Sequence, residues 1–158
     1  MREGEEEWHK THHNRLAFFT GTTLVPTSID HSSKEILFVP TYGLEYERGI
    51  NAWLGIGIAN EIELQNYVIQ KSNSEVINRS FIYVVSVFVM VQPVKPLVIF
   101  AGPGYELTSS QNFSIFKVGA SYIIDVGNKF DVSPEIALDQ IADKYATFTF
   151  GISLGKRF

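Results

Sequence analysis

The C-terminal stretch YATFTFGISLGKRF, residues 145–158, is the strongest indication of the fold in this sequence. One side of the stretch is apolar and consists of its even positions, interrupted only by Lys156: Ala146, Phe148, Phe150, Ile152, Leu154 and Phe158. The other side is mostly small or polar: Tyr145, Thr147, Thr149, Gly151, Ser153, Gly155 and Arg157. Because a side-chain period of two is that of a β-strand, the stretch predicts a strand with one oily face.

The same alternation recurs along the chain and predicts an all-β protein. Eight segments are expected to be strands, with turn residues between them: 15–26, 35–48, 52–69, 79–93, 97–108, 113–126, 130–141 and 145–158. Residues 1–14 have neither a strand nor a helix period, so they are expected to form a mobile acidic tail. An even strand number is what a closed antiparallel barrel with both ends on one side requires. No helical pattern of useful length occurs, which disfavours βαβ folds.

The polar face of these strands indicates which side of the barrel is inside. In segment 52–69, Ile56 and Ile58 alternate with Gly55, Gly57 and glutamates. A solvated outer face would carry long polar side chains, whereas a glycine-rich face fits a narrow interior. The pattern therefore favours the inside-out arrangement of a membrane barrel, with the oily face outward.

With this strand number, alternation and GISLGKRF ending, residues 15–158 resemble the small eight-stranded outer-membrane barrels of the OmpA, OmpX and OmpW kind. The resemblance implies a closed antiparallel eight-stranded transmembrane β-barrel in a bacterial outer membrane. It also implies that Phe158, with Phe150, Ile152 and Leu154, is the signal read by the barrel-assembly machinery. Lys156 departs from that pattern, in which an apolar or aromatic residue is usual.

An eight-stranded barrel is just wide enough for side chains to fill it, so a packed polar lumen without an open pore is expected. Folding the chain about Asn128 sets Lys117 opposite Asp139, and folding it about Lys144 sets Asp131 opposite Arg157; both are predicted ion pairs. Other carboxylates expected to face inward are Glu45, Glu47, Glu61, Glu63, Glu106, Asp125 and Glu135. Glu135 lies at mid-depth with no base opposite it, which makes its ionisation the one expected to be perturbed. These groups fit a structural network, and a proton- or cation-handling role is the alternative.

Composition narrows the function classes. A net charge of -4 without a Lys/Arg stripe argues against nucleic-acid binding, and the absence of cysteine excludes disulfides and thiolate metal sites. His9, His12 and His13 beside the tail glutamates are weak metal-ligand candidates, and no cofactor is expected. His31 lies near Ser28, Asp30, Ser32 and Ser33, but triad members normally come from distant segments, so an enzyme is not expected.

The expected role is structural or interactive: membrane stabilisation, or service as an accessory subunit of a larger envelope complex. The expected partners are the lipid bilayer, lipopolysaccharide and the barrel-assembly machinery. Two alternatives stay open. One is a soluble lipocalin-like barrel holding an apolar ligand, in which Phe150, Ile152 and Leu154 would point inward. The other is an outer-leaflet lipid-modifying enzyme.

Overall fold

The computed structural model describes residues 14–26, 35–65, 67–70, 76–79, 81–109, 111–143 and 145–158. They form eleven strands: β1 (Asn14–Pro26), β2 (Ile36–Gly49), β3 (Leu54–Glu63), β4 (Tyr67–Gln70), β5 (Val76–Arg79), β6 (Ile82–Val94), β7 (Leu97–Leu107), β8 (Asn112–Tyr122), β9 (Ile124–Gly127), β10 (Phe130–Ile141) and β11 (Tyr145–Arg157). Within these described segments, no helix is long and apolar enough to cross a membrane.

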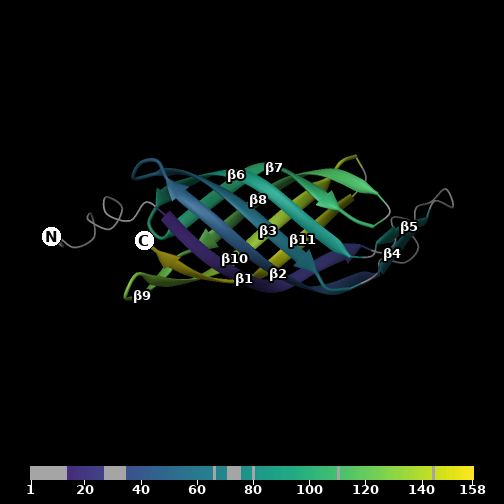
Figure 1. The fold of residues 1–158 in the computed structure, drawn as a ribbon, viewed down its shortest axis with the longest axis horizontal. Helices are drawn as coiled ribbons and strands as arrows, with labels where there is room; N and C mark the ends of the chain where they lie inside the picture. Colours follow the sequence, from purple (N-terminus) through teal and green to yellow (C-terminus); the bar gives the residue numbers. More distant parts are fainter. Residues whose placement is uncertain are drawn as a thin grey trace.

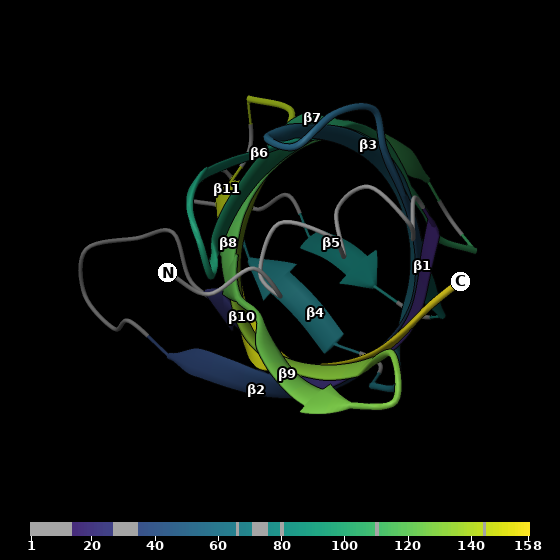
Figure 2. The same cartoon turned by 90° about the vertical axis from the view of Figure 1, so that its left-hand side faces the viewer.

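Eight strands close into one antiparallel barrel in the order β1, β2, β3, β6, β7, β8, β10 and β11. β11 closes the ring against β1, from the pair Arg15 and Arg157 to the pair Leu24 and Phe148 (Figure 2). Each of these eight strands therefore has a neighbour on both sides, which removes the exposed edges of an open sheet. The predicted fold class is confirmed.

The two ends of the barrel differ. β1 begins and β11 ends at the end that lies on the left in Figure 1, which we call the termini end. Three short turns close strand pairs there, at residues 50–53, 95–96 and 128–129. The β4–β5 hairpin lies at the opposite end, the loop end. Two of the four connections at the loop end, residues 27–35 and 64–81, are long, whereas residues 108–111 and 142–144 are short connections. Short turns at one end and longer connections at the other are typical of outer-membrane barrels, in which the short turns face the periplasm.

Two of the expected strands are each divided in the structure. Segment 52–69 becomes β3 and β4, because the pairing of β3 with β2 ends at Glu63. Segment 113–126 becomes β8 and β9. Beyond Tyr122 the chain loses its β7 partner, since β7 begins at Leu97 after the turn at residues 95–96, and the N–H of Ile123 instead donates to the carbonyl of Pro96 at 3.0 Å. β9 then pairs with β10 alone and extends past the ring at the termini end.

The outer face of the barrel is apolar and the inner face carries the charges. Leu154 is 52% exposed and Phe18 is 44% exposed, whereas Asp131 is 1% exposed and Lys117 is 2% exposed. A soluble barrel would have the opposite distribution. The lipocalin-like alternative required Phe150, Ile152 and Leu154 to point inward, and all three point outward. The chain is therefore built as a membrane barrel.

Apolar side chains gather in the loop-end half of the lumen. They form one buried cluster, which we call the loop-end apolar cluster: Val25, Val39, Ile82, Val84, Phe113, Ile115, Ile141 and Tyr145. They come from the ends of β1 and β10 and from the beginnings of β2, β6, β8 and β11. The expectation of a polar lumen is therefore wrong for the side chains of this cluster, whereas Glu63 of β3 and Glu106 of β7, both expected to face inward, are buried beside it.

Glycines on the inner face make room for inward aromatic rings. Gly21 and Gly151 face each other across the β1–β11 pair, and the buried ring of Phe19 lies over both. A Cβ added to Gly151 would lie 2.7 Å from Cζ of that ring and would also clash with the carbonyl of Thr20. Side chains at these two positions would therefore displace Phe19 from the middle of the lumen.

Candidate functional site

Four charged residues gather in the lumen at the termini end, which we call the termini-end charge cluster: Arg15, Glu47, Asp131 and Arg157. The guanidinium of Arg15 lies 2.6 Å from Glu47 Oε1 and 2.7 Å from Asp131 Oδ1. Asp131 Oδ2 lies 3.0 Å from Nη2 of Arg157. The carboxylate of Asp131 is thus shared by two guanidinium groups. The four residues come from β1, β2, β10 and β11, so the cluster joins the strands on either side of the barrel closure.

Serine hydroxyls extend this cluster toward the middle of the lumen. Nη2 of Arg15 donates to Ser153 Oγ at 3.0 Å and to Ser133 Oγ at 3.4 Å. Ser153 Oγ donates in turn to Glu45 Oε2 at 3.3 Å. These hydroxyls help to satisfy the guanidinium of Arg15, whose side chain is 9% exposed. Burying a charge at this depth is tolerable only with such partners.

A second group, the central charge cluster, consists of Lys117, Glu61 and Asp139. Nζ of Lys117 lies 2.7 Å from Oε1 and 2.6 Å from Oε2 of Glu61, and 3.4 Å from Oδ2 of Asp139. Lys117 is on β8 and Asp139 is opposite it on the adjacent β10, whereas Glu61 is on β3. One ammonium group therefore bridges the lumen between strands that are not neighbours.

The structure brings both expected ion pairs together, with one difference in register. Lys117 is directly opposite Asp139, as expected from folding about Asn128. Asp131 is opposite Gly155 and not Arg157, so the expected register of the last hairpin is wrong by two residues. The pair of Ile141 and Tyr145 centres the turn on residue 143, where folding about residue 144 had been expected. Arg157 reaches Asp131 along the diagonal instead.

Glu135 and Asp125 differ from the other expected lumen carboxylates. Glu135 is half-buried between Ser121 of β8 and Gly151 of β11. Within the described part of the chain, its side chain makes no hydrogen bond or ion pair. Asp125 is not in the lumen: it is on β9 at the rim, its side chain is 56% exposed, and it lies 3.4 Å from Nη1 of Arg157. Asp125 is opposite Asp131 of β10 and shares its face, as expected, but β9 lies beyond the ring and leaves the side chain exposed.

The sequence reasoning did not identify Arg15, the residue with the most polar partners in the lumen. A signal was present, because Arg15 precedes the alternation of apolar Leu16 and Phe18 and therefore shares the opposite face with Ala17 and Phe19. It also did not identify the hydroxyl chain in which Thr23 Oγ1 lies 2.7 Å from Thr41 Oγ1 and 2.9 Å from Thr149 Oγ1.

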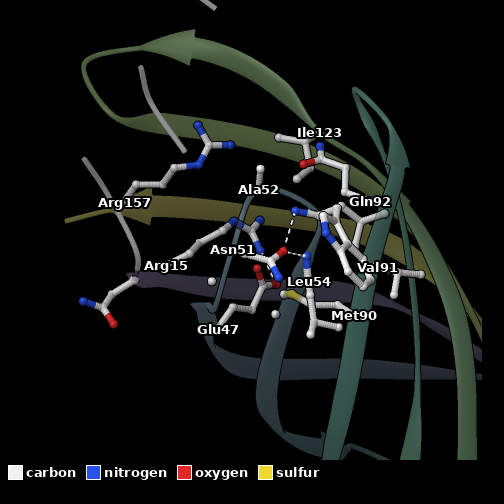
Figure 3. Close-up of a pocket in the computed structure, with 15 residues that line it drawn as sticks. Arg15, Glu47, Asn51, Ala52, Leu54, Met90, Val91, Gln92, Ile123 and Arg157 are labelled. Atoms are coloured by element: carbon white, nitrogen blue, oxygen red, sulfur yellow. Dashed lines mark hydrogen bonds and ion pairs between the residues drawn. The ribbon is translucent and has the colours of Figure 1, made fainter. Parts of the chain in front are cut away.

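A small cavity lies next to the termini-end charge cluster (Figure 3). Its volume is about 90 Å³, enough for a few water molecules. The turn at residues 50–53 forms one wall, where Asn51 Oδ1 accepts hydrogen bonds from the N–H groups of Trp53 at 3.0 Å and Leu54 at 2.9 Å. The N–H of Gln92 donates to the carbonyl of Trp53 at 2.8 Å and ties this turn to β6. Arg15, Glu47 and Arg157 line the cavity beside the turn.

The residues expected to form the assembly signal lie on the outer face. Phe150, Ile152 and Leu154 of β11 point outward, and Phe158 follows the strand with 55% of its surface exposed. Lys156, on the same face, lies over the ring of Phe130 at 5.3 Å from its centroid. This stacking explains how a cation fits among aromatic residues at the rim. The metal-ligand candidates His9, His12 and His13, and the candidate enzyme residue His31, lie outside the described residues.

Comparison with known proteins gives a consistent class of fold. No protein-family model matches the chain, and no curated protein sequence matches it. The N-terminal β-barrel domain of Pseudomonas aeruginosa OprF matches with a TM-score of 0.65 and 10% identity, covering 93% of this chain and 98% of that one. Ail, the attachment invasion locus protein of Yersinia pestis, solved with the heparin analogue sucrose octasulfate, matches with a TM-score of 0.62 and 13% identity over 93% and 99%.

The chain has the fold of an outer-membrane β-barrel. Neisserial surface protein A is a third structure with this fold, at a TM-score of 0.60 and 8% identity, covering 92% of this chain and 96% of that one. At these identities the likeness concerns the fold. The resemblance to small eight-stranded outer-membrane barrels is confirmed, and a bacterial outer membrane, the location expected from the sequence, is the location of this class of barrel.

Proposed function

We propose that this outer-membrane barrel is a non-conducting membrane protein with a structural or interaction role, either stabilising the membrane or serving in a larger envelope complex. The observation that supports a non-conducting barrel most directly is the loop-end apolar cluster. Side chains from six barrel strands meet inside the ring, including Val25, Ile82, Phe113 and Ile141. An apolar constriction excludes water and ions from a narrow passage, because hydrated ions would have to shed their water there.

The charged half of the lumen supports the same proposal. Lys117 reaches across the barrel to Glu61, so this side chain and its partner occupy the lumen between β8 and β3. Asp131 and Arg15 link β10 to β1 in the same way at the termini end. Conduction would require these ion pairs to separate. Because the lumen is filled, the surfaces that remain available for interactions are the lipid-facing side of the barrel and the connections at its loop end.

A conductance measurement tests this proposal. The wild-type barrel, reconstituted in planar bilayers, is expected to give no stepwise conductance in 1 M KCl. A variant with alanine at Ile82, Phe113, Ile141, Lys117 and Arg15 removes large side chains from both halves of the lumen and is expected to conduct if it folds, as checked by the gel shift between boiled and unboiled samples. Stable conductance steps from the wild-type protein would contradict a non-conducting role.

The proposed partners are the lipid bilayer with its lipopolysaccharide, the barrel-assembly machinery and other envelope proteins. Residues 27–34 and 70–78 are the proposed binding loops, and most of these residues fall outside the described part of the chain. We assign no enzymatic activity to the barrel. An unchanged lipid A mass spectrum on expression of the protein is the expected result, whereas modified lipid A would favour the lipid-modifying enzyme.

Replacing Phe158 tests the proposed assembly signal. Phe158→Ala is expected to lower the amount of folded barrel in cell membranes several-fold, while folding of the purified chain in detergent stays unchanged, because the change removes a recognition contact and no packing in the lumen. Phe148→Ala is the matched control, since Phe148 is an outward aromatic of the same strand outside the proposed signal. Equal membrane levels of Phe158→Ala and wild type would rule out this role.

A further inference from the structure

The lipid-facing surface of the barrel has a groove of about 440 Å³ across β2, β3, β6 and β7. Ala101 of β7 lines it opposite Val89 of β6. Ile56 and Ile58 of β3 line it between β2 and β6. The groove is long, apolar and open to the outside of the barrel, which is the shape and chemistry that fit an acyl chain.

A cation lies at one side of this groove. Arg48 lines it and is opposite Ile56, which in turn is opposite Val89, so Arg48 is in register with two apolar residues of the groove. Arg48 is the residue before the last in β2, and thus lies at the termini end of the barrel. Within the described residues, its exposed side chain makes no hydrogen bond or ion pair.

Charge is otherwise nearly absent from the outer face. Among the described residues of the eight barrel strands, the outward positions carry two charged side chains, Arg48 and Lys156, and both are cations near the termini end. The ammonium group of Lys156 already has a partner, because it lies over the ring of Phe130. A charged side chain in contact with hydrocarbon is costly without a partner, and a guanidinium binds a phosphate through two parallel hydrogen bonds.

We propose that this groove with Arg48 is a binding site for one anionic glycerophospholipid of the leaflet at the termini end, with its phosphate at Arg48 and an acyl chain over Ala101 and Val89. Tyr46 lines the groove beside Arg48, and its hydroxyl donates to Asn14 Oδ1 at 2.7 Å, which fixes the ring at the rim. An aromatic residue and a cation together at the edge of the apolar band match the headgroup level of a bilayer. The inference rests on the membrane location of the barrel and not on the absence of conduction.

The experiment uses the full-length barrel reconstituted in vesicles of phosphatidylcholine and phosphatidylglycerol, extracted in mild detergent and analysed by native mass spectrometry. The wild type is expected to retain one phosphatidylglycerol in preference to phosphatidylcholine. Arg48→Gln is expected to reduce this preference about fivefold, the effect of one basic residue near an anionic surface. Ala101→Leu, which fills the groove and keeps the charge, is expected to reduce retention as well.

Lys156→Gln is the matched control, because it removes the same charge at the same end but on β11, away from the groove. It is expected to retain phosphatidylglycerol like the wild type. An equal loss in Lys156→Gln, or no preference in the wild type, would overturn the proposed site. A wild-type dimer without lipid would assign the groove to a second copy and overturn it too. Conductance by the wild type would contradict the proposed function and leave the lipid ratios unaffected.

Discussion

Replacing Asp131 with alanine is expected to lower the free energy of unfolding by about 3–5 kcal/mol, the usual effect of removing one member of a buried ion pair. Asp131 lies between Arg15 at 2.7 Å and Arg157 at 3.0 Å, so its loss leaves two guanidinium groups close together in the lumen. Glu47 still neutralises Arg15 at 2.6 Å, which keeps the expected effect from being larger.

The effect can be measured by denaturant unfolding of the barrel in lipid vesicles, with Trp53 fluorescence as the signal in a Trp8→Phe background. Trp53 lines the cavity beside the termini-end charge cluster, so it reports on this region. Asp125→Ala is the matched control, because Asp125 also lies near Arg157 but its side chain is 56% exposed. An exposed pair of this kind contributes about 0–1 kcal/mol. Equal losses in the two variants would show that the bridging position of Asp131 has no special importance.

Replacing Lys117 with methionine is expected to be similarly severe, again by about 3–5 kcal/mol. Methionine fills much of the same volume but leaves the carboxylates of Glu61 and Asp139 without their shared cation. Adding Glu61→Gln to this variant is expected to recover part of the loss, because it removes the carboxylate that lies 2.6 Å from Nζ of Lys117.

Double-mutant cycles separate the two partners of Lys117. The coupling of Lys117 with Glu61 is expected to exceed its coupling with Asp139, since the shortest distances are 2.6 Å and 3.4 Å. Denaturant unfolding in vesicles gives each corner of the cycle. If Lys117→Met unfolds at the wild-type denaturant concentration, or if neither carboxylate is coupled to Lys117, the central charge cluster does not hold the barrel together.

The sequence could predict the register of one hairpin better than that of the next, and the turns explain why. Gly127, Asn128 and Lys129 all have positive φ angles, at 90°, 54° and 68°. A glycine followed by an asparagine favours such angles, so the turn centre is visible in the sequence and Lys117 opposite Asp139 follows from it. The last hairpin has Ala142 at a φ of 42° and no glycine or asparagine nearby. Its turn centre, and with it the position of Asp131, could not be located in this way.

Contacts across the lumen could not be predicted from neighbouring strands at all. The pair of Lys117 with Glu61 depends on the stagger of the whole barrel, which no single turn determines. The loop-end apolar cluster could not be predicted from the sequence either, for a different reason. Around Val25 and Val39 the inward and outward positions are both apolar, as in Leu24 and Phe38, so alternation there does not distinguish an oily lumen from an oily outer face.

The partners of Arg15 also constrain the order in which the barrel can be completed. Asp131 follows Arg15 by 116 residues and Ser153 follows it by 138, so the first strand depends on the last two. Until these strands arrive, Arg15 has Glu47 of the neighbouring β2 at 2.6 Å, and Glu45 of the same strand also helps to neutralise it. A guanidinium exposed to hydrocarbon costs about 2.5–3.5 kcal/mol on insertion scales. We therefore expect a chain that ends before residue 131, in which Arg15 lacks both Asp131 and Ser153, to insert into the membrane less well than the complete barrel.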